Sequence, residues 1–148
     1  MNKIIKALLP IFILSIFSSC QNNGNIGDWY GMWKLQSITI DGVDDPEYEP
    51  NVFWKFQTGV IQMVRYSETS GSTGTGTWKE KNGILELTYE YSDNSNPEAS
   101  RKYSTLSGMH LPATGVIPLE ITKKPSSSMI LTYRAEDGTN YVYTFKKW

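Results

Sequence analysis

The sequence is poor in cysteine and in surplus positive charge. Cys20 is the only cysteine among 148 residues, so the chain forms no internal disulfide and its core depends on packing. Lys3 and Lys6 account for two of the 14 Lys and Arg, which leaves 12 against 15 Asp and Glu after residue 19, a formal charge of −3. Phosphate contacts need clustered cations, so this balance argues against nucleic acid as a partner.

Motifs of the common catalytic classes are also missing. No Gly-x-Ser-x-Gly elbow marks out one serine, and no Gly-Lys-Ser or Gly-Lys-Thr closes a phosphate-binding loop. The single histidine, His110, lies between Gly108 and Pro112, where it can act as a general base or ligate haem iron. A solvated loop histidine is the simpler interpretation. The sequence predicts a protein that is not an enzyme and holds no cofactor or metal.

One acidic segment carries the oxygen ligands that calcium prefers. It contains Asp41, Asp44, Asp45, Glu47 and Glu49. The spacing differs from that of an EF-hand loop, and two prolines interrupt the segment. We therefore expect a solvated acidic loop without a bound ion.

Long apolar runs are absent except near the N-terminus. Residues 7–17 are almost wholly apolar, follow two lysines, and lead into Ser18, Ser19 and Cys20. This run is too short to span a bilayer, and the order of segments is typical of an export signal. A cysteine directly after small residues resembles the signal of bacterial lipoproteins. The resemblance implies that residues 1–19 are removed and that Cys20 is acylated and becomes the first residue.

The segment that follows this cysteine predicts where the domain lies. Residues 20–28 read as the lipidated cysteine and a short flexible tether, because positions 21–27 are mostly polar or small and carry no charge. Bacterial lipoproteins usually carry three acyl chains, palmitate among them, so the resemblance implies a permanent anchor in the membrane. The acidic run of many surface-exported lipoproteins is missing. We expect a lipid anchor in the cell envelope, on the periplasm-facing side of the outer membrane.

The rest of the chain alternates apolar and polar residues with a period of two. Leu85, Leu87 and Tyr89 alternate with polar residues, as do several later runs, and such alternation is typical of strands with one buried face. The predicted strands cover residues 32–40, 51–57, 60–66, 75–80, 84–91, 101–106, 117–123, 128–134 and 140–147. Turn dipeptides such as Asn82-Gly83 and Asp137-Gly138 separate them.

The connections between these strands indicate an up-and-down antiparallel β-barrel of eight to nine strands. No helical stripe follows residue 20, so the crossovers of a parallel sheet are missing. Consecutive hairpins favour a closed barrel, which also removes exposed edges. Pro118 inside a predicted strand indicates an edge or a bulge at that point.

Short motifs along residues 29–148 resemble the lipocalin and calycin group. They are Gly31-Met32-Trp33, Trp54-Lys55-Phe56, Gly74-Thr75-Gly76-Thr77-Trp78, and the final pair of runs at 129–133 and 141–145. The order is similar to that of small lipocalin-like lipoproteins of Gram-negative gut bacteria. The resemblance implies a lipocalin-like all-β barrel, in which a basic residue of the last strand packs over Trp33. Lys146 and Lys147 are the candidates for that role.

The aromatic residues give two interpretations of the barrel interior. A barrel of about eight strands is either filled by side chains or holds one small ligand. The candidate ligand-lining residues are Trp33, Trp54, Phe56, Tyr89, Tyr91, Tyr133 and Tyr143. In the other interpretation the same residues form only the core of a narrow barrel.

Two functions are therefore expected. The first is binding of a small apolar or amphipathic ligand at the barrel mouth. The alternative is a packed barrel that interacts with an envelope protein, for instance as a hydrolase inhibitor. Residues 67–76 or 107–116 would then be the loop that inserts into the partner.

Overall fold

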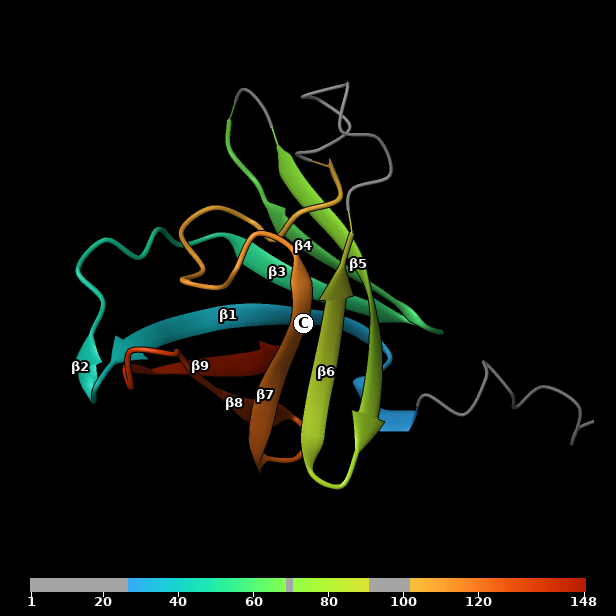
Figure 1. Ribbon diagram of the computed structural model, residues 1–148. Helices are drawn as coiled ribbons and strands as arrows, with labels where there is room; N and C mark the ends of the chain where they lie inside the picture. Colours follow the sequence, from blue (N-terminus) through green and yellow to red (C-terminus); the bar gives the residue numbers. More distant parts are fainter. Residues whose placement is uncertain (1–26, 69–70, 91–101) are drawn as a thin grey trace, which may run out of the picture.

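The computed structural model describes residues 27–68, 71–90 and 102–148 (Figure 1). Its elements are the 3₁₀ helix η1 (Gly27–Trp29) and the strands β1 (Gly31–Ile40), β2 (Val43–Asp44), β3 (Val52–Gln57), β4 (Val60–Arg65), β5 (Ser72–Lys81), β6 (Ile84–Tyr89), β7 (Gly115–Lys123), β8 (Ser128–Arg134) and β9 (Asn140–Lys147). The lipidation site predicted at Cys20 lies outside the described residues, as does Tyr91.

The strands form an antiparallel barrel with up-and-down connections. Each strand from β3 to β8 pairs with the next along the chain, and β1 pairs with both β3 and β9, which closes the barrel. The short β2 is an extra strand on the far end of β1, opposite Thr39 and Ile40. The predicted fold class is confirmed, because eight antiparallel strands make the closed barrel and are paired in chain order.

Three details of the strands differ from the prediction or refine it. Residues 102–106 form no strand, so the strand predicted over 101–106 is wrong in its described part. The strand predicted from residue 75 begins at Ser72, because its Ser- and Gly-rich start pairs with β4. Pro118 lies opposite Glu86 of β6 and has no partner residue in β8. The pairing of β7 with β8 begins only at Glu120, and its register shifts after Ile121. The missing N–H of the proline is thereby tolerated.

The core fills the inside of the barrel and follows the predicted alternation. Leu85, Leu87 and Tyr89 of β6 are fully buried, while the residues between them are half-buried. Strand β9 is similar, with Tyr143 and Phe145 at zero exposure. Burial of such large side chains contributes about 1.5 to 3 kcal/mol each, so these inward rows are the main source of stability.

The two ends of the barrel differ. At one end η1 packs against the start of β1, and Trp29 donates its indole N–H to Glu80 at 2.6 Å. At the other end, called the open end here, lie residues 45–51, which connect β2 to β3, and residues 102–114, which precede β7. Residues 102–114 turn back over this end, because Leu106 and Met109 are buried in the core. Among the described residues, no helix has the length and apolar character needed to cross a bilayer.

Candidate functional site

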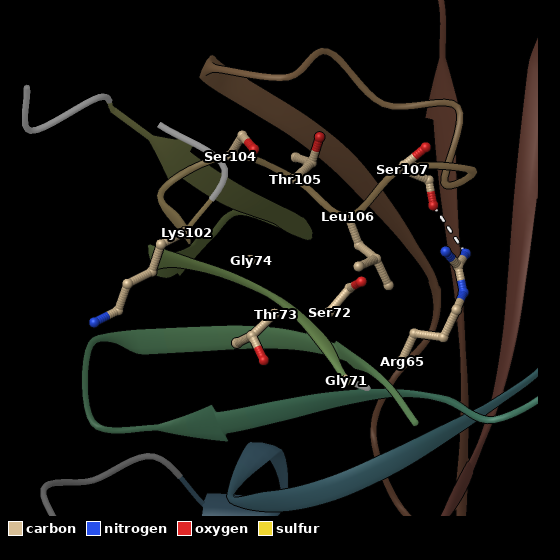
Figure 2. A pocket seen from close by; sticks show the side chains of 10 residues that line it. All are labelled: Arg65, Gly71, Ser72, Thr73, Gly74, Lys102, Ser104, Thr105, Leu106 and Ser107. Atoms are coloured by element: carbon tan, nitrogen blue, oxygen red, sulfur yellow. Dashed lines mark hydrogen bonds between the residues drawn. The ribbon is translucent and has the colours of Figure 1, made fainter. Parts of the chain in front are cut away.

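A cleft of about 440 Å³ lies at the open end, beside the segment that covers the core. We call it the rim cleft. Its lining residues are Arg65, Gly71, Ser72, Thr73, Gly74, Lys102, Ser104, Thr105, Leu106 and Ser107. Figure 2 shows the start of β5 on one side and residues 104–107 on the other, with Arg65 and Lys102 at opposite ends. The lining offers five hydroxyl groups and two cations, and it includes no carboxylate.

Glycine allows the two walls of the rim cleft to come together. A Cβ atom on Gly74 would lie 2.1 Å from the carbonyl oxygen of Ser104, a contact that no real side chain makes. Gly74 therefore lets residues 102–107 cross β5 at this point. Hydrogen bonds fix the crossing segment, since Thr105 donates its N–H to Ala113 and its hydroxyl to Pro112, both at 2.9 Å.

Arg65 brings positive charge to the cleft. It ends β4 at a position that faces inward, in line with the buried Ile61 and Met63. One of its terminal nitrogens donates to the carbonyl of Ser107 at 2.8 Å (Figure 2). Its Nε forms an ion pair with the exposed Glu49 at 3.8 Å, which is too long for a hydrogen bond, and this buried atom has no hydrogen-bond partner among the described residues. The guanidinium is thus held in place with donor capacity left over.

A second polar group joins the loops of the open end. His110 Nε2 lies 2.7 Å from Asp45 Oδ2, and the His110 ring stacks on Tyr141 at 5.0 Å. The Asp45 side chain is only 3% exposed. Burial opposes ionisation of Asp45, but hydrogen bonds from His110 and from the Glu47 N–H, together with the His110 charge, hold its pKa below the ordinary 3.8.

This pair corrects two expectations. The acidic segment is not solvated throughout, because Asp45 is buried against His110, and His110 is not a free loop residue. The sequence did not indicate this contact, because 65 positions separate Asp45 from His110. Within the part of the chain that the structure describes, no group of three or more acidic, histidine or cysteine side chains is arranged to hold a metal ion.

The predicted ligand-lining residues lie inside the barrel and not in the rim cleft. Trp33, Trp54, Phe56, Tyr89 and Tyr143 have zero exposure, and Tyr133 is 9% exposed. They pack with other core rings. The centre of the Trp54 ring, for example, lies 4.8 Å from that of Phe145 and 5.7 Å from that of Tyr143. Their role as ligand lining stays a prediction.

Two of these interior side chains have unused polar atoms. Trp54 Nε1 and the Tyr89 hydroxyl are buried without a hydrogen-bond partner among the described residues. Burial raises the pKa of the Tyr89 phenol, so it stays protonated and can donate. The Tyr143 hydroxyl, by contrast, donates to the carbonyl of Met109 at 2.5 Å and ties the covering segment to the core.

Residues 71–74 and Ser107 of the rim cleft lie in the two loops that were expected to insert into a partner, but the sequence marked no residue of the cleft as ligand lining. Arg65 carried a usable signal, because it places a charge on the inward side of an alternating strand after Ile61 and Met63. The hydroxyls of residues 104–107 carried none, since serine and threonine are common in loops.

Comparison with known proteins assigns the fold to a family. A family model described as a lipocalin-like domain matches residues 15–148. The chain belongs to the lipocalin-like domain family. A lipocalin-like protein from Bacteroides uniformis ATCC 8492 has a similar crystal structure, with a TM-score of 0.59 and 19% identity over 82% of this chain and 100% of that chain. The crystal structure of an uncharacterized protein from Bacteroides eggerthii DSM 20697 gives a TM-score of 0.57 and 22% identity over 81% and 99%. A search of the curated proteins finds no match.

Proposed function

We propose that this lipocalin-like chain is a non-enzymatic, lipid-anchored binding protein of the cell envelope. It takes one small amphipathic molecule at the barrel mouth, with an anionic group of the ligand against Arg65 in the rim cleft. The observation that carries this proposal is the Arg65 guanidinium, which lines a 440 Å³ cleft whose lining includes no carboxylate. A carboxylate or phosphate group of a ligand can form charge-assisted hydrogen bonds with such a guanidinium.

The cleft also has a place for the apolar part of the ligand. The Leu106 side chain points toward the start of β5 (Figure 2). The backbone of Gly71 and Gly74 adds wall without polar side chains, and the five hydroxyls can bond to polar atoms of the ligand. A molecule with a charged head and an apolar chain matches this lining.

Binding is tested with dodecanoate as the probe, by isothermal titration calorimetry on residues 21–148. Arg65→Gln removes the charge and should weaken dodecanoate binding by about tenfold or more, the loss expected for one hydrogen bond to a charged group. Arg134→Gln is the matched control, because Arg134 is exposed at the end of β8 and does not line the cleft. Equal affinities of the two variants would contradict the placement of the ligand.

The anchor is supported by the sequence around Cys20, where an apolar run, two serines and the cysteine follow one another. Expression in a Gram-negative host with a labelled palmitate analogue tests it. The chain should take up the label and fractionate with the outer membrane, whereas Cys20→Ser should do neither. Labelling that persists in the variant would contradict lipidation at this residue.

The barrel interior is a second candidate place for the ligand. The unpartnered Trp54 Nε1 and Tyr89 hydroxyl favour it, since a bound polar atom can satisfy each of them. A ligand there requires residues 102–114 to move, because Met109 is buried over the core. The rim cleft needs no such movement, and for this reason we prefer it.

The alternative function, a barrel that inserts a loop into an envelope enzyme, has less support. In the loop over residues 107–116, Met109 packs inward, and Gly115 already belongs to β7. Residues 72–76 of the other loop belong to β5. Part of each expected insertion loop is therefore held in the barrel wall or in the core.

A further inference from the structure

A patch of aromatic and basic side chains lies on the outside of the barrel, and none of its members lines the rim cleft. We call it the outer patch. It consists of Lys34, Phe53, Lys55, Tyr66, Lys146 and Trp148. Lys34 of β1 stands opposite Phe53 of β3 on one side and Lys146 of β9 on the other. Because the neighbouring Trp33 and Leu35 face the core, Lys34 faces outward.

The aromatic members make a second small cluster outside the core. The Phe53 ring meets Tyr66 edge to face at 5.5 Å and Trp148 at 5.3 Å, and these two rings cover it. They remain open to solvent themselves, since Trp148 is 70% exposed and Tyr66 44% exposed. An exposed tryptophan and tyrosine with an apolar base are typical of surfaces that contact a partner.

The basic members are not neutralised by acidic neighbours. Lys34 Nζ lies 5.1 Å from the centre of the Trp148 ring, and Lys55 Nζ lies 5.4 Å from the Tyr66 ring and donates to its hydroxyl at 2.7 Å. No salt bridge between described residues involves Lys34, Lys55 or Lys146. A chain with net negative charge thus gathers uncompensated cations on one face of the barrel.

A hollow of about 360 Å³ opens within this surface. Lys34, Gln36, Lys146, Lys147 and Trp148 line it. Its lining has ammonium groups, an amide and an indole ring, but no carboxylate. An anionic headgroup of a lipid has the charge and the polar oxygens that such a lining binds.

We propose that the outer patch docks on the surface of an anionic lipid bilayer. Lysines are attracted to the negative potential of such a surface, while the rings of tryptophan and tyrosine settle at the level of the headgroups. Charge and composition both favour a lipid surface over a neutral or apolar partner.

The end of the chain that leads to the anchor emerges beside this patch. Lys147 Nζ donates to the carbonyls of Asp28 and Tyr30, and the Trp148 N–H donates to the carbonyl of Met32 at 2.9 Å. From Cys20 to Gly27 the chain spans at most about 25 Å even when fully extended. This placement rests on the proposed lipid anchor, whereas the composition of the patch does not.

Docking is tested by co-sedimentation with vesicles, using residues 21–148 without the acyl group. All barrel strands lie within residues 31–147, so this form keeps the whole barrel. The probes are vesicles of equal parts phosphatidylglycerol and phosphatidylcholine, compared with phosphatidylcholine alone. The protein should sediment with the anionic vesicles only, and high salt should release it because the attraction is screened.

Two charge-matched variants decide whether the patch is responsible. Lys34→Gln, Lys55→Gln and Lys146→Gln together should weaken partitioning to the anionic vesicles on the order of a hundredfold. Lys79→Gln, Lys81→Gln and Lys124→Gln remove the same charge from exposed positions outside the patch and should leave partitioning unchanged. Trp148→Ala keeps all the lysines and should still weaken binding.

Each remaining result would overturn the proposal. These are sedimentation with neither vesicle, equal sedimentation with both, or equal losses in the two triple variants. Capture of an acidic protein without vesicle binding would assign the patch to a protein partner instead. Arg65→Gln should leave vesicle binding unchanged, so failure of docking and failure of the rim cleft are told apart.

Discussion

The ammonium group of Lys147 lies 4.3 Å from the centre of the Trp33 ring. Trp33 is fully buried and donates its indole N–H to the carbonyl of Trp29 at 3.0 Å, so η1 holds the ring from one side and Lys147 covers it. Lys147 also donates to the carbonyls of Asp28 and Tyr30. Of the two lysines that the family resemblance offered for this role, Lys147 is confirmed and Lys146 belongs to the outer surface.

The first prediction concerns this contact. Lys147→Met should lower the free energy of unfolding by about 1 to 3 kcal/mol, because it removes the cation from the ring and the donors from two carbonyls. Lys147→Arg keeps a cation and should lose less. Urea unfolding measures both, with Lys146→Met as the control for an exposed lysine. A loss in the control as large as in Lys147→Met would contradict the role of the contact.

The second prediction compares two buried tyrosines. Tyr143→Phe should lower the free energy of unfolding by about 1 to 3 kcal/mol, because the carbonyl of Met109 loses its donor. Tyr89→Phe should leave stability unchanged or slightly higher, since its hydroxyl has no partner among the described residues. Thermal unfolding of the two variants checks this. Strong destabilisation by Tyr89→Phe would reveal a bound water or ligand inside the barrel.

The third prediction concerns acid stability. The folded-state pKa of Asp45 lies below its ordinary 3.8, so its contribution to stability is present above about pH 3.8 and is lost as the pH falls through the folded-state pKa. The wild-type chain should therefore lose more unfolding free energy on acidification than Asp45→Asn. Urea titrations on both sides of this pH measure the difference. Parallel pH curves for the two proteins would show that the His110 contact adds no stability.

The fourth prediction concerns the crossing at Gly74. Gly74→Ala should cost about 1 to 3 kcal/mol, because the new methyl group forces residues 102–107 away from β5. Gly71→Ala is the control, since a Cβ there lies at an ordinary 3.5 Å from the nearest backbone atom. The Gly74 variant should also lose dodecanoate binding, measured by calorimetry below its melting temperature. Unchanged stability and binding would mean that the cleft walls can separate freely.

The barrel could be predicted from the sequence because its evidence is local. Alternation in runs such as 84–89 fixes which side chains face inward, and turn dipeptides such as Asn82-Gly83 fix where strands reverse. The cover over the open end could not be predicted in this way. Leu106 and Met109 lie in a segment without periodicity, and their burial depends on contacts such as that with Tyr143, 34 residues away.

The candidate site likewise has a part that local patterns predict and a part that depends on contacts between distant residues. The aromatic interior was visible as a pattern, and it is the core. In the sequence, Arg65 is only a charge at an inward position. Its place in a cleft depends on residues 104–107, which lie far away in the sequence and come near Arg65 because the chain turns back over the barrel. Alternation alone misread part of that segment as a strand over 101–106.

The central claim is that an amphipathic anion binds in the rim cleft against Arg65. NMR of residues 21–148 during titration with dodecanoate tests it most directly, because side-chain N–H signals of arginine and tryptophan report on each place separately. The account predicts a saturable shift of the Arg65 Nε–H signal, with little change at Trp54 Nε1–H and none at Arg134. Saturable shifts at Trp54 without a change at Arg65 would contradict it and place the ligand inside the barrel.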